Sequence, residues 1–201
     1  MAKTLEFIFD FASPNCWFAY RALGPILART DATLAIEPAL LGGIFKATGN
    51  QAPFVAFANV KGKVDYERRE IARFVARHGL AQFRMNPHFP VNTLILMRGF
   101  VAARARGQGD AYLEAGLKGM WEEGLDLADA AVLTARLTAA GLDGAGLVAQ
   151  AQAPEVKAEL ARSTDAAVAR GVFGLPSFFV GDEMFFGKER LAQIEEELTQ
   201  P

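Results

Sequence analysis

The chain has 201 residues, of which 51% are hydrophobic, and its 21 basic and 23 acidic residues give a formal net charge of −2. This length suits one compact unit with room for an insertion. Because the basic residues form no tract, we expect no nucleic-acid partner. No apolar run approaches the roughly 20 residues that cross a bilayer, and the N-terminus lacks the pattern of a secretion signal, so we expect a cytoplasmic protein with no membrane partner.

Cysteine and histidine are scarce in this sequence. The chain contains one cysteine, Cys16, and two histidines, His78 and His88. A single cysteine excludes an intramolecular disulfide. A zinc site of the usual kind would need all three of these side chains together with a carboxylate, and their spacings match no known pattern. We therefore expect no metal site.

The first predicted elements, in chain order, are a strand, a helix and a second strand. Residues 5–11 (LEFIFDF) form a short apolar and aromatic run, which is typical of a buried strand. Ser13 followed by Pro14 is a preferred helix start, and we expect this helix to reach about Ala28. Residues 33–37 (TLAIE) predict the second strand, which should be parallel to the first because a helix-length crossover joins them.

The middle of the chain, from about residue 40 to 159, shows no further strand pattern. Apolar residues recur there with helical spacing, and Gly-rich or Pro-rich breaks separate the segments. The helices predicted in this part cover residues 63–78, 92–105, 111–121 and 129–139. The pattern therefore indicates a helical insertion.

The last part of the chain begins with a helix predicted over about 155–170 and then returns to a strand pattern. SFFV (177–180) and MFF (184–186) flank a Gly-Asp-Glu turn and predict a hairpin. A last helix is expected over 188–198.

Strand, helix, strand, insertion, hairpin and helix is the order of an α/β thioredoxin fold that is split by an α-helical insertion domain. We expect the thioredoxin-like domain to comprise residues 1–39 and 172–201, and the insertion domain to comprise residues 40–171. In open α/β sheets a ligand binds at the carboxyl ends of the strands, where the first helix also begins. Ser13 is at that point of the predicted fold.

The segment FDFASPNCW (9–17) places the Ser13 hydroxyl at the start of the first helix, with Cys16 three residues later. This is the spacing of the Cys-x-x-Cys pair of thioredoxins, with serine in the nucleophile's place. The positive end of a helix dipole stabilises a nearby thiolate, to which a hydroxyl can donate a hydrogen bond. The alternative is that Ser13 is an ordinary helix cap. For Cys16 we favour burial against the sheet over a redox role, because it has no partner cysteine.

Leu175 and Pro176 directly precede the apolar strand SFFV. A cis bond between them would turn the N–H and C=O of Leu175 outward, where both can pair with an extended peptide. A trans proline in a loop is the more common arrangement. Together with the Ser-Pro element and the split fold, the pattern favours the cis form.

These segments together resemble the family of 2-hydroxychromene-2-carboxylate isomerases and kappa-class glutathione transferases, which are relatives of the DsbA-type oxidoreductases. The resemblance runs over nearly the whole chain. It is carried by DFASPNCW (10–17), LLGGIFKATGN (40–50), WEEGLDL (121–127) and FGLPSFFVGDEMFFGKER (173–190). It implies that the active-site serine of the family is Ser13 here.

The resemblance also implies glutathione as cofactor. The residues that it assigns to glutathione binding are Ser13, Asn50, Leu175, Pro176, Gly187, Lys188 and Glu189. The pair Lys188-Glu189 departs from the small polar residue plus Asp that is usual in the family, so the carboxylate sits on a longer side chain. Two assignments have an alternative. Asn50 lies in a turn signal, where an asparagine usually bonds its own backbone, and Lys188 suits a solvated first turn of a helix.

The activity implied by the resemblance interconverts an aromatic pyruvate derivative between a ring-closed chromene and a ring-opened trans-alkene. The glutathione thiolate would add to the conjugated carbon, and elimination after bond rotation would release glutathione unchanged. One alternative is a kappa-type glutathione transferase or peroxidase, and another is a non-catalytic module that binds thiols or peptides. On resemblance alone we expect a homodimer. His88 and Asn92 have no assigned role, and we interpret most aromatic residues as core.

Overall fold

The computed structural model describes residues 2–200 and contains a sheet of four strands in the order β2-β1-β3-β4. β1 (Thr4–Phe9) and β2 (Thr33–Pro38) are parallel, and α1 (Pro14–Thr30) connects them. β3 (Ser177–Val180) and β4 (Glu183–Phe186) form an antiparallel hairpin, and β3 also pairs antiparallel with β1. The predicted fold class, a thioredoxin fold interrupted by helices, is confirmed.

The chain between β2 and β3 forms only helices and loops within the described residues. The helices are α2 (Leu41–Thr48), α3 (Pro53–Ala56), α4 (Lys63–His78), α5 (Leu94–Ala105), α6 (Gly109–Trp121), α7 (Ala130–Ala139), α8 (Gly144–Gln150) and α9 (Pro154–Ala169). After the hairpin come η1 (Lys188–Arg190), a single 3₁₀ turn, and α10 (Leu191–Thr199). Helices α2, α3 and α8 were not among the predicted elements.

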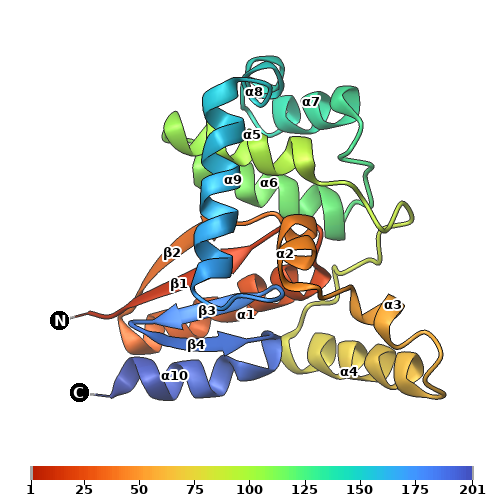
Figure 1. The fold of residues 1–201 in the computed structure, drawn as a ribbon, viewed down its shortest axis with the longest axis vertical. Coiled ribbons are helices and arrows are strands. Elements are labelled where there is room, and N and C mark those ends of the chain that lie inside the picture. Colours follow the sequence, from red (N-terminus) through yellow and green to blue (C-terminus); the bar gives the residue numbers. More distant parts are fainter. Residues whose placement is uncertain (1, 201) are drawn as a thin grey trace.

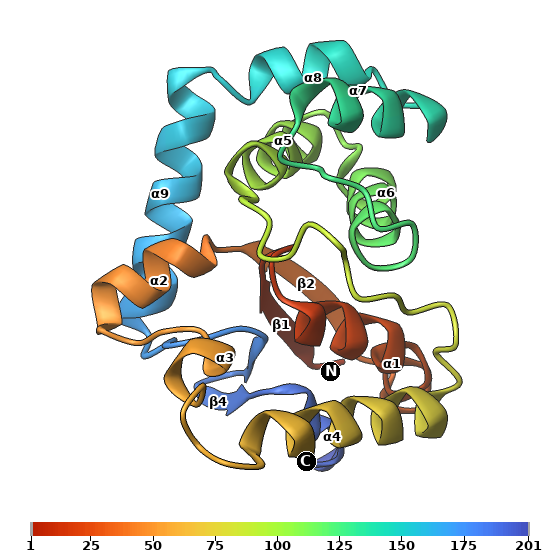
Figure 2. The same ribbon diagram turned by 90° about the vertical axis from the view of Figure 1, so that its right-hand side faces the viewer.

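Helices α5 to α8 gather at one end of the molecule, and α9 runs from that end back to the sheet (Figure 1). Helix α4 lies at the opposite end, close to α1 (Figure 2). All four strands fall within residues 1–39 and 172–201, as expected. The division of the chain into two domains at these boundaries stays a prediction. No helix in residues 2–200 has both the length and the apolar character needed to cross a membrane.

Aromatic side chains fill the core where the end of β1 meets α5 and α6. Phe9 and Phe11 meet edge to face, with ring centroids 5.1 Å apart, and both are fully buried. Trp121 at the end of α6 is also fully buried, and its indole N–H donates to the Phe11 carbonyl at 2.9 Å. The core interpretation of the aromatics therefore holds for these residues, whereas Phe54 and Phe186 are exposed. The end of α6 is therefore bonded to the turn that leads into Ser13.

β1 ends at Phe9, two residues earlier than predicted. The reason is a turn in which the Ser13 N–H donates to the Asp10 carbonyl at 3.2 Å, so the chain leaves the sheet at Asp10. Pro14 then occupies the first position of α1, where its missing N–H costs nothing. This turn places Ser13 at the carboxyl end of β1.

Candidate active site

Ser13 lies at the N-cap position of α1, with extended backbone angles, but its side chain does not cap the helix. The hydroxyl instead donates to the Leu175 carbonyl at 3.2 Å, across 162 residues of sequence. The side chain is buried, with 5% of the residue exposed. The alternative interpretation as an ordinary capping serine is therefore wrong. The hydroxyl lies at the positive end of α1 and faces the segment before β3.

Residues 173–176 are the common hydrogen-bond partner of Ser13, Asn50 and Gly187. The Leu175–Pro176 bond is cis, as the sequence pattern predicted. The Leu175 carbonyl accepts from Ser13, and the Pro176 carbonyl accepts from the Gly187 N–H at 2.9 Å. Within residues 2–200 no backbone or side-chain group accepts a hydrogen bond from the Leu175 N–H. A donor is thus left for an extended ligand at this position.

Asn50 follows α2 and is joined to the same segment. Its side-chain amide donates to the Phe173 carbonyl at 2.8 Å, and its side-chain oxygen accepts from the Gln51 N–H at 2.8 Å. The turn interpretation is thus correct for the oxygen, because it bonds the local backbone. The amide nitrogen reaches across 123 residues and brings Asn50 beside the stretch that contains Leu175.

Gly187 and Lys188 lie where β4 passes into η1. Gly187 has φ +95°, a backbone conformation that residues other than glycine rarely adopt. Lys188 has only 4% of its surface exposed, and its ammonium pairs with the exposed carboxylate of Glu189 and lies 5.2 Å from the Phe74 ring of α4. The interpretation of Lys188 as a solvated residue is therefore wrong. Its ammonium is held between an aromatic face and a carboxylate.

Cys16 faces the core and is fully buried. Burial raises the pKa of its thiol from 9.0 to about 12, although the backbone at Asp10 and the side chain of Ser13 oppose this shift. A thiol with this pKa stays protonated at neutral pH and is a poor nucleophile. This supports the preference for a core cysteine over a redox cysteine.

His88 and Asn92, which had no assigned role, are bonded locally. The His88 N–H donates to the Asn86 side chain at 2.8 Å, and Asn92 accepts from the Leu94 N–H at the start of α5 at 3.0 Å. Within residues 2–200, no group of three or more His, Cys, Asp or Glu side chains is arranged to hold a metal ion.

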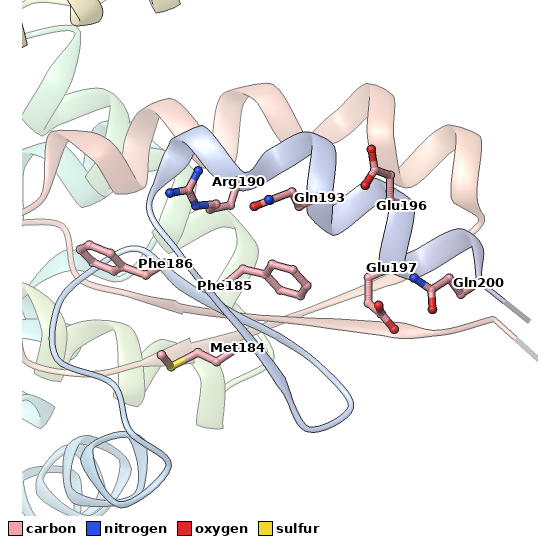
Figure 3. Close-up of a pocket in the computed structure, with 8 residues that line it drawn as sticks. All are labelled: Met184, Phe185, Phe186, Arg190, Gln193, Glu196, Glu197 and Gln200. Atoms are coloured by element: carbon pink, nitrogen blue, oxygen red, sulfur yellow. The ribbon is translucent and has the colours of Figure 1, made fainter.

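Two cavities lie away from Ser13. One, of about 430 Å³, lies between β4 and α10, with Phe185 on one side and Gln193 and Glu197 on the other (Figure 3). The other, of about 270 Å³, lies between α9 and the carboxylates of Glu6 and Glu37 on the sheet. Neither cavity is lined by a residue that the sequence assigned to glutathione.

Asp10, the residue at which the chain leaves β1, was missed by the sequence analysis. It is fully buried, and its carboxylate accepts hydrogen bonds from the Ala12 N–H at 2.9 Å, the Leu41 N–H at 2.8 Å and the Thr93 hydroxyl at 2.6 Å. Burial raises the pKa of this carboxyl, and the three hydrogen bonds partly offset the increase. The available signal was an acidic residue inside the otherwise apolar run LEFIFDF.

The sequence matches the DSBA-like thioredoxin domain family over residues 4–199. It is 29% identical to a 2-hydroxychromene-2-carboxylate isomerase of Sphingobium xenophagum, over 97% of each chain. It is 25% identical to glutathione S-transferase kappa 1 of Homo sapiens, over 95% of this chain and 88% of the relative.

Solved structures agree with these matches. The fold superimposes on a 2-hydroxychromene-2-carboxylate isomerase with a TM-score of 0.82 at 25% identity, over 96% of this chain and 93% of the other. A probable DsbA oxidoreductase from Streptomyces coelicolor, at 19% identity, shares the fold with a TM-score of 0.77, over 98% of this chain and 89% of the other. The chain belongs to the DSBA-like thioredoxin family, and its similar relatives there include 2-hydroxychromene-2-carboxylate isomerases and kappa-class glutathione transferases.

Proposed function

We propose that this chain is a glutathione-dependent isomerase that acts on a 2-hydroxychromene-2-carboxylate or a similar aromatic pyruvate derivative. The observation that carries the proposal is the Ser13 hydroxyl, which lies at the start of α1, makes no capping bond and donates instead to Leu175. Such a hydroxyl can turn its hydrogen to a thiolate at modest cost, since it leaves only one neutral partner. The isomerases that the chain resembles over nearly its full length supply the substrate class.

In the proposed complex, glutathione lies along residues 173–176 as an extended peptide. The N–H of Leu175 donates to its backbone, and Asn50 and Gly187 flank the same segment through their bonds to Phe173 and Pro176. The carboxylate of Glu189 pairs with the ammonium of the γ-glutamyl end, and the buried Lys188 holds that carboxylate in place.

The proposed chemistry uses the thiolate as a reversible nucleophile. The α1 dipole and the Ser13 hydroxyl stabilise the thiolate, which adds to the conjugated carbon of the enone and moves the alkene electrons toward the carbonyl. The former double bond is then single and rotates. Elimination breaks the same C–S bond, restores the alkene in the other geometry and returns glutathione unchanged. Ser13 forms no covalent bond in this scheme, and Cys16 takes no part.

The test is glutathione binding measured by calorimetry, with thiolate absorbance followed across pH, for wild type, Ser13→Ala and the matched control Ser163→Ala. The Ser163 hydroxyl also donates to a backbone carbonyl, that of Pro38, but lies on α9. Loss of one hydrogen bond to an anion, about 1.5–3 kcal/mol, should raise the pKa of bound glutathione by about one to two units in Ser13→Ala only. Wild type that fails to bind glutathione would refute the proposal.

The similarity to kappa-class transferases favours a second candidate, in which the same thiolate attacks an electrophile and stays attached to it. The two candidates differ in their products. Recovery of all glutathione after conversion of a hydroxychromene carboxylate identifies the isomerase, and a stoichiometric conjugate identifies the transferase. On the same resemblance we propose a cytoplasmic homodimer, which light scattering tests as twice the mass of one chain.

A further inference from the structure

Three helices begin around the buried carboxylate of Asp10. Ala12 immediately precedes the N-cap of α1, Leu41 is the first residue of α2, and Thr93 is the N-cap residue of α5. All three donate to the Asp10 carboxylate, at 2.6 to 2.9 Å. Within residues 2–200 no basic side chain forms an ion pair with it. The positive ends of these helices are therefore its main electrostatic compensation.

None of these helices is capped by its own N-cap side chain. Ser13 turns its hydroxyl to Leu175, Leu40 has no polar group, and Thr93 donates its hydroxyl to Asp10. Helix starts normally satisfy their free N–H groups with a side-chain oxygen at the N-cap. Here the Asp10 carboxylate accepts from the first N–H of α2, as an N-cap side chain would, and from the Ala12 N–H in the turn before α1.

Two of the proposed glutathione contacts, Ser13 and Asn50, depend on these helix starts. Ser13 is one residue beyond Ala12, and Asn50 comes two residues after the end of α2. The same carboxylate also bonds Thr93 on α5, which packs against α6 and α9 of the insertion. Asp10 thus links the Ser13 turn, the helix leading to Asn50, and the insertion helices.

We propose that Asp10 is a positioning residue. It fixes the Ser13 hydroxyl relative to α2, the helix that leads to Asn50, so that Ser13 and Asn50 can bind the same glutathione molecule; this inference rests on the proposed function. A carboxylate is suited to the task because both of its oxygens only accept. In Asp10→Asn the amide nitrogen must face either the Ala12 or the Leu41 N–H, and the donors repel each other.

The experiment compares wild type with Asp10→Asn, Thr93→Val and Thr93→Ser, and uses Thr134→Val as the matched control. Thr134 donates its hydroxyl to Ala130 within α7, away from Asp10. The first readout is kcat/KM with glutathione and a hydroxychromene carboxylate, together with the pKa of bound glutathione. The second is hydrogen exchange by mass spectrometry without any ligand, which needs no activity.

We expect kcat/KM to fall by about a hundredfold in Asp10→Asn and about tenfold in Thr93→Val, because displacement of a site by about 1 Å has effects of this size. Thr93→Ser keeps the hydroxyl and should stay within about twofold of wild type, as should Thr134→Val. The pKa of bound glutathione should rise in Asp10→Asn. Removal of a nearby negative charge alone would lower it, so the direction distinguishes positioning from electrostatics.

In hydrogen exchange, Asp10→Asn and Thr93→Val should accelerate peptides over residues 11–16 and 41–50 selectively. Unchanged exchange and kcat/KM in both variants would overturn the proposal, as would an equal acceleration of all peptides or a lowered pKa of bound glutathione. If wild type shows no turnover with glutathione, the proposed function fails. The exchange pattern then decides alone whether Asp10 positions these two segments.

Discussion

The turn around Ser13 and the segment of α3 and α4 differ most in how their apolar side chains are packed. Around Ser13, the side chains of Phe9, Phe11 and Trp17 are fully buried. In the other segment, Phe54 and Phe57 are 45% and 40% exposed, and neither α3 nor α4 contains a buried residue. Burial of apolar area is the main source of stability, so the two regions differ in their resistance to opening.

The turn before Ser13 is the more tightly bonded of the two regions. The Ser13 hydroxyl donates to the Leu175 carbonyl, and the turn before it is held by bonds from the Ala12 N–H to Asp10 and from the Trp121 indole to the Phe11 carbonyl. Helix α3 begins three residues after Asn50, and α4 packs against the core through partly buried side chains that include Phe74, whose ring centroid is 5.7 Å from that of Phe18. Segments that admit ligands come from the less stable parts of proteins.

The largest expected effect is on the free energy of unfolding, when a phenylalanine is replaced by alanine in each region in turn. Phe11→Ala removes a fully buried ring and leaves a cavity, which should lower the free energy of unfolding by about 3–5 kcal/mol. Phe57→Ala removes an exposed ring that contacts the Lys63 ammonium at 5.4 Å, so its cost should stay below about 1 kcal/mol. Urea denaturation measures both. Equal costs would remove the contrast between the regions.

A pair of glycines tests packing around the Ser13 turn more finely. A Cβ at Gly116 of α6 would lie 2.5 Å from the Phe11 ring, so Gly116→Ala should destabilise by about 1–3 kcal/mol. Gly42→Ala is the control, because a Cβ at Gly42 of α2 meets nothing within 4 Å. Removal of glycine from that helix should stabilise the protein by about 0.5–1 kcal/mol. Thermal unfolding of both variants gives the two signs, and the same sign for both would contradict close packing at Phe11.

Cys16 gives a pH-dependent test of the same core. Its thiol pKa is raised from 9.0 to about 12 by burial, so above pH 9 the unfolded chain loses a proton that the folded chain keeps. The stability contributed by the neutral thiol is complete below pH 9 and is lost as the pH rises toward 12. The free energy of unfolding of wild type should therefore fall by about 1.4 kcal/mol per pH unit in this window, relative to Cys16→Ala. Parallel curves for the two proteins would mean that Cys16 is accessible to water.

The sequence was sufficient for the elements whose periodicity is long. The helix at residues 63–78 and the strands at β2 and β3 follow from spacing and residue type. Helices α2 and α8 were missed because each is short and contains glycine, and in α2 also because a tertiary partner bonds its N-terminal end. The Leu40 N–H at the start of α2, for example, bonds the Thr164 hydroxyl of α9 at 2.9 Å. Such a partner, 124 residues away, leaves no local pattern.

The site was predictable to a different degree. Ser13 and Leu175 could be named from the Ser-Pro helix start and the Leu-Pro step before β3, the family resemblance assigned their roles, and the structure adds the bond between them. The burial of Lys188 could not be predicted, since it depends on Phe74 of α4, which the sequence leaves unplaced. Asp10 and Thr93 are 83 residues apart and neither belongs to a catalytic pattern. Long-range hydrogen bonds to buried charges are therefore the part of the site that only the fold reveals.

The smallest effect expected concerns cleavage between α3 and α4. Lys61 is exposed in the connection between these helices, so trypsin should cut there first while the rest of the chain stays intact. If cleavage requires only local opening, Phe11→Ala should leave the rate at Lys61 within about twofold of wild type, although it removes several kcal/mol of global stability. Mass spectrometry of early digests identifies the site and gives the rate. A rate that rises about tenfold for every 1.4 kcal/mol of lost stability would mean that the two regions open as one unit.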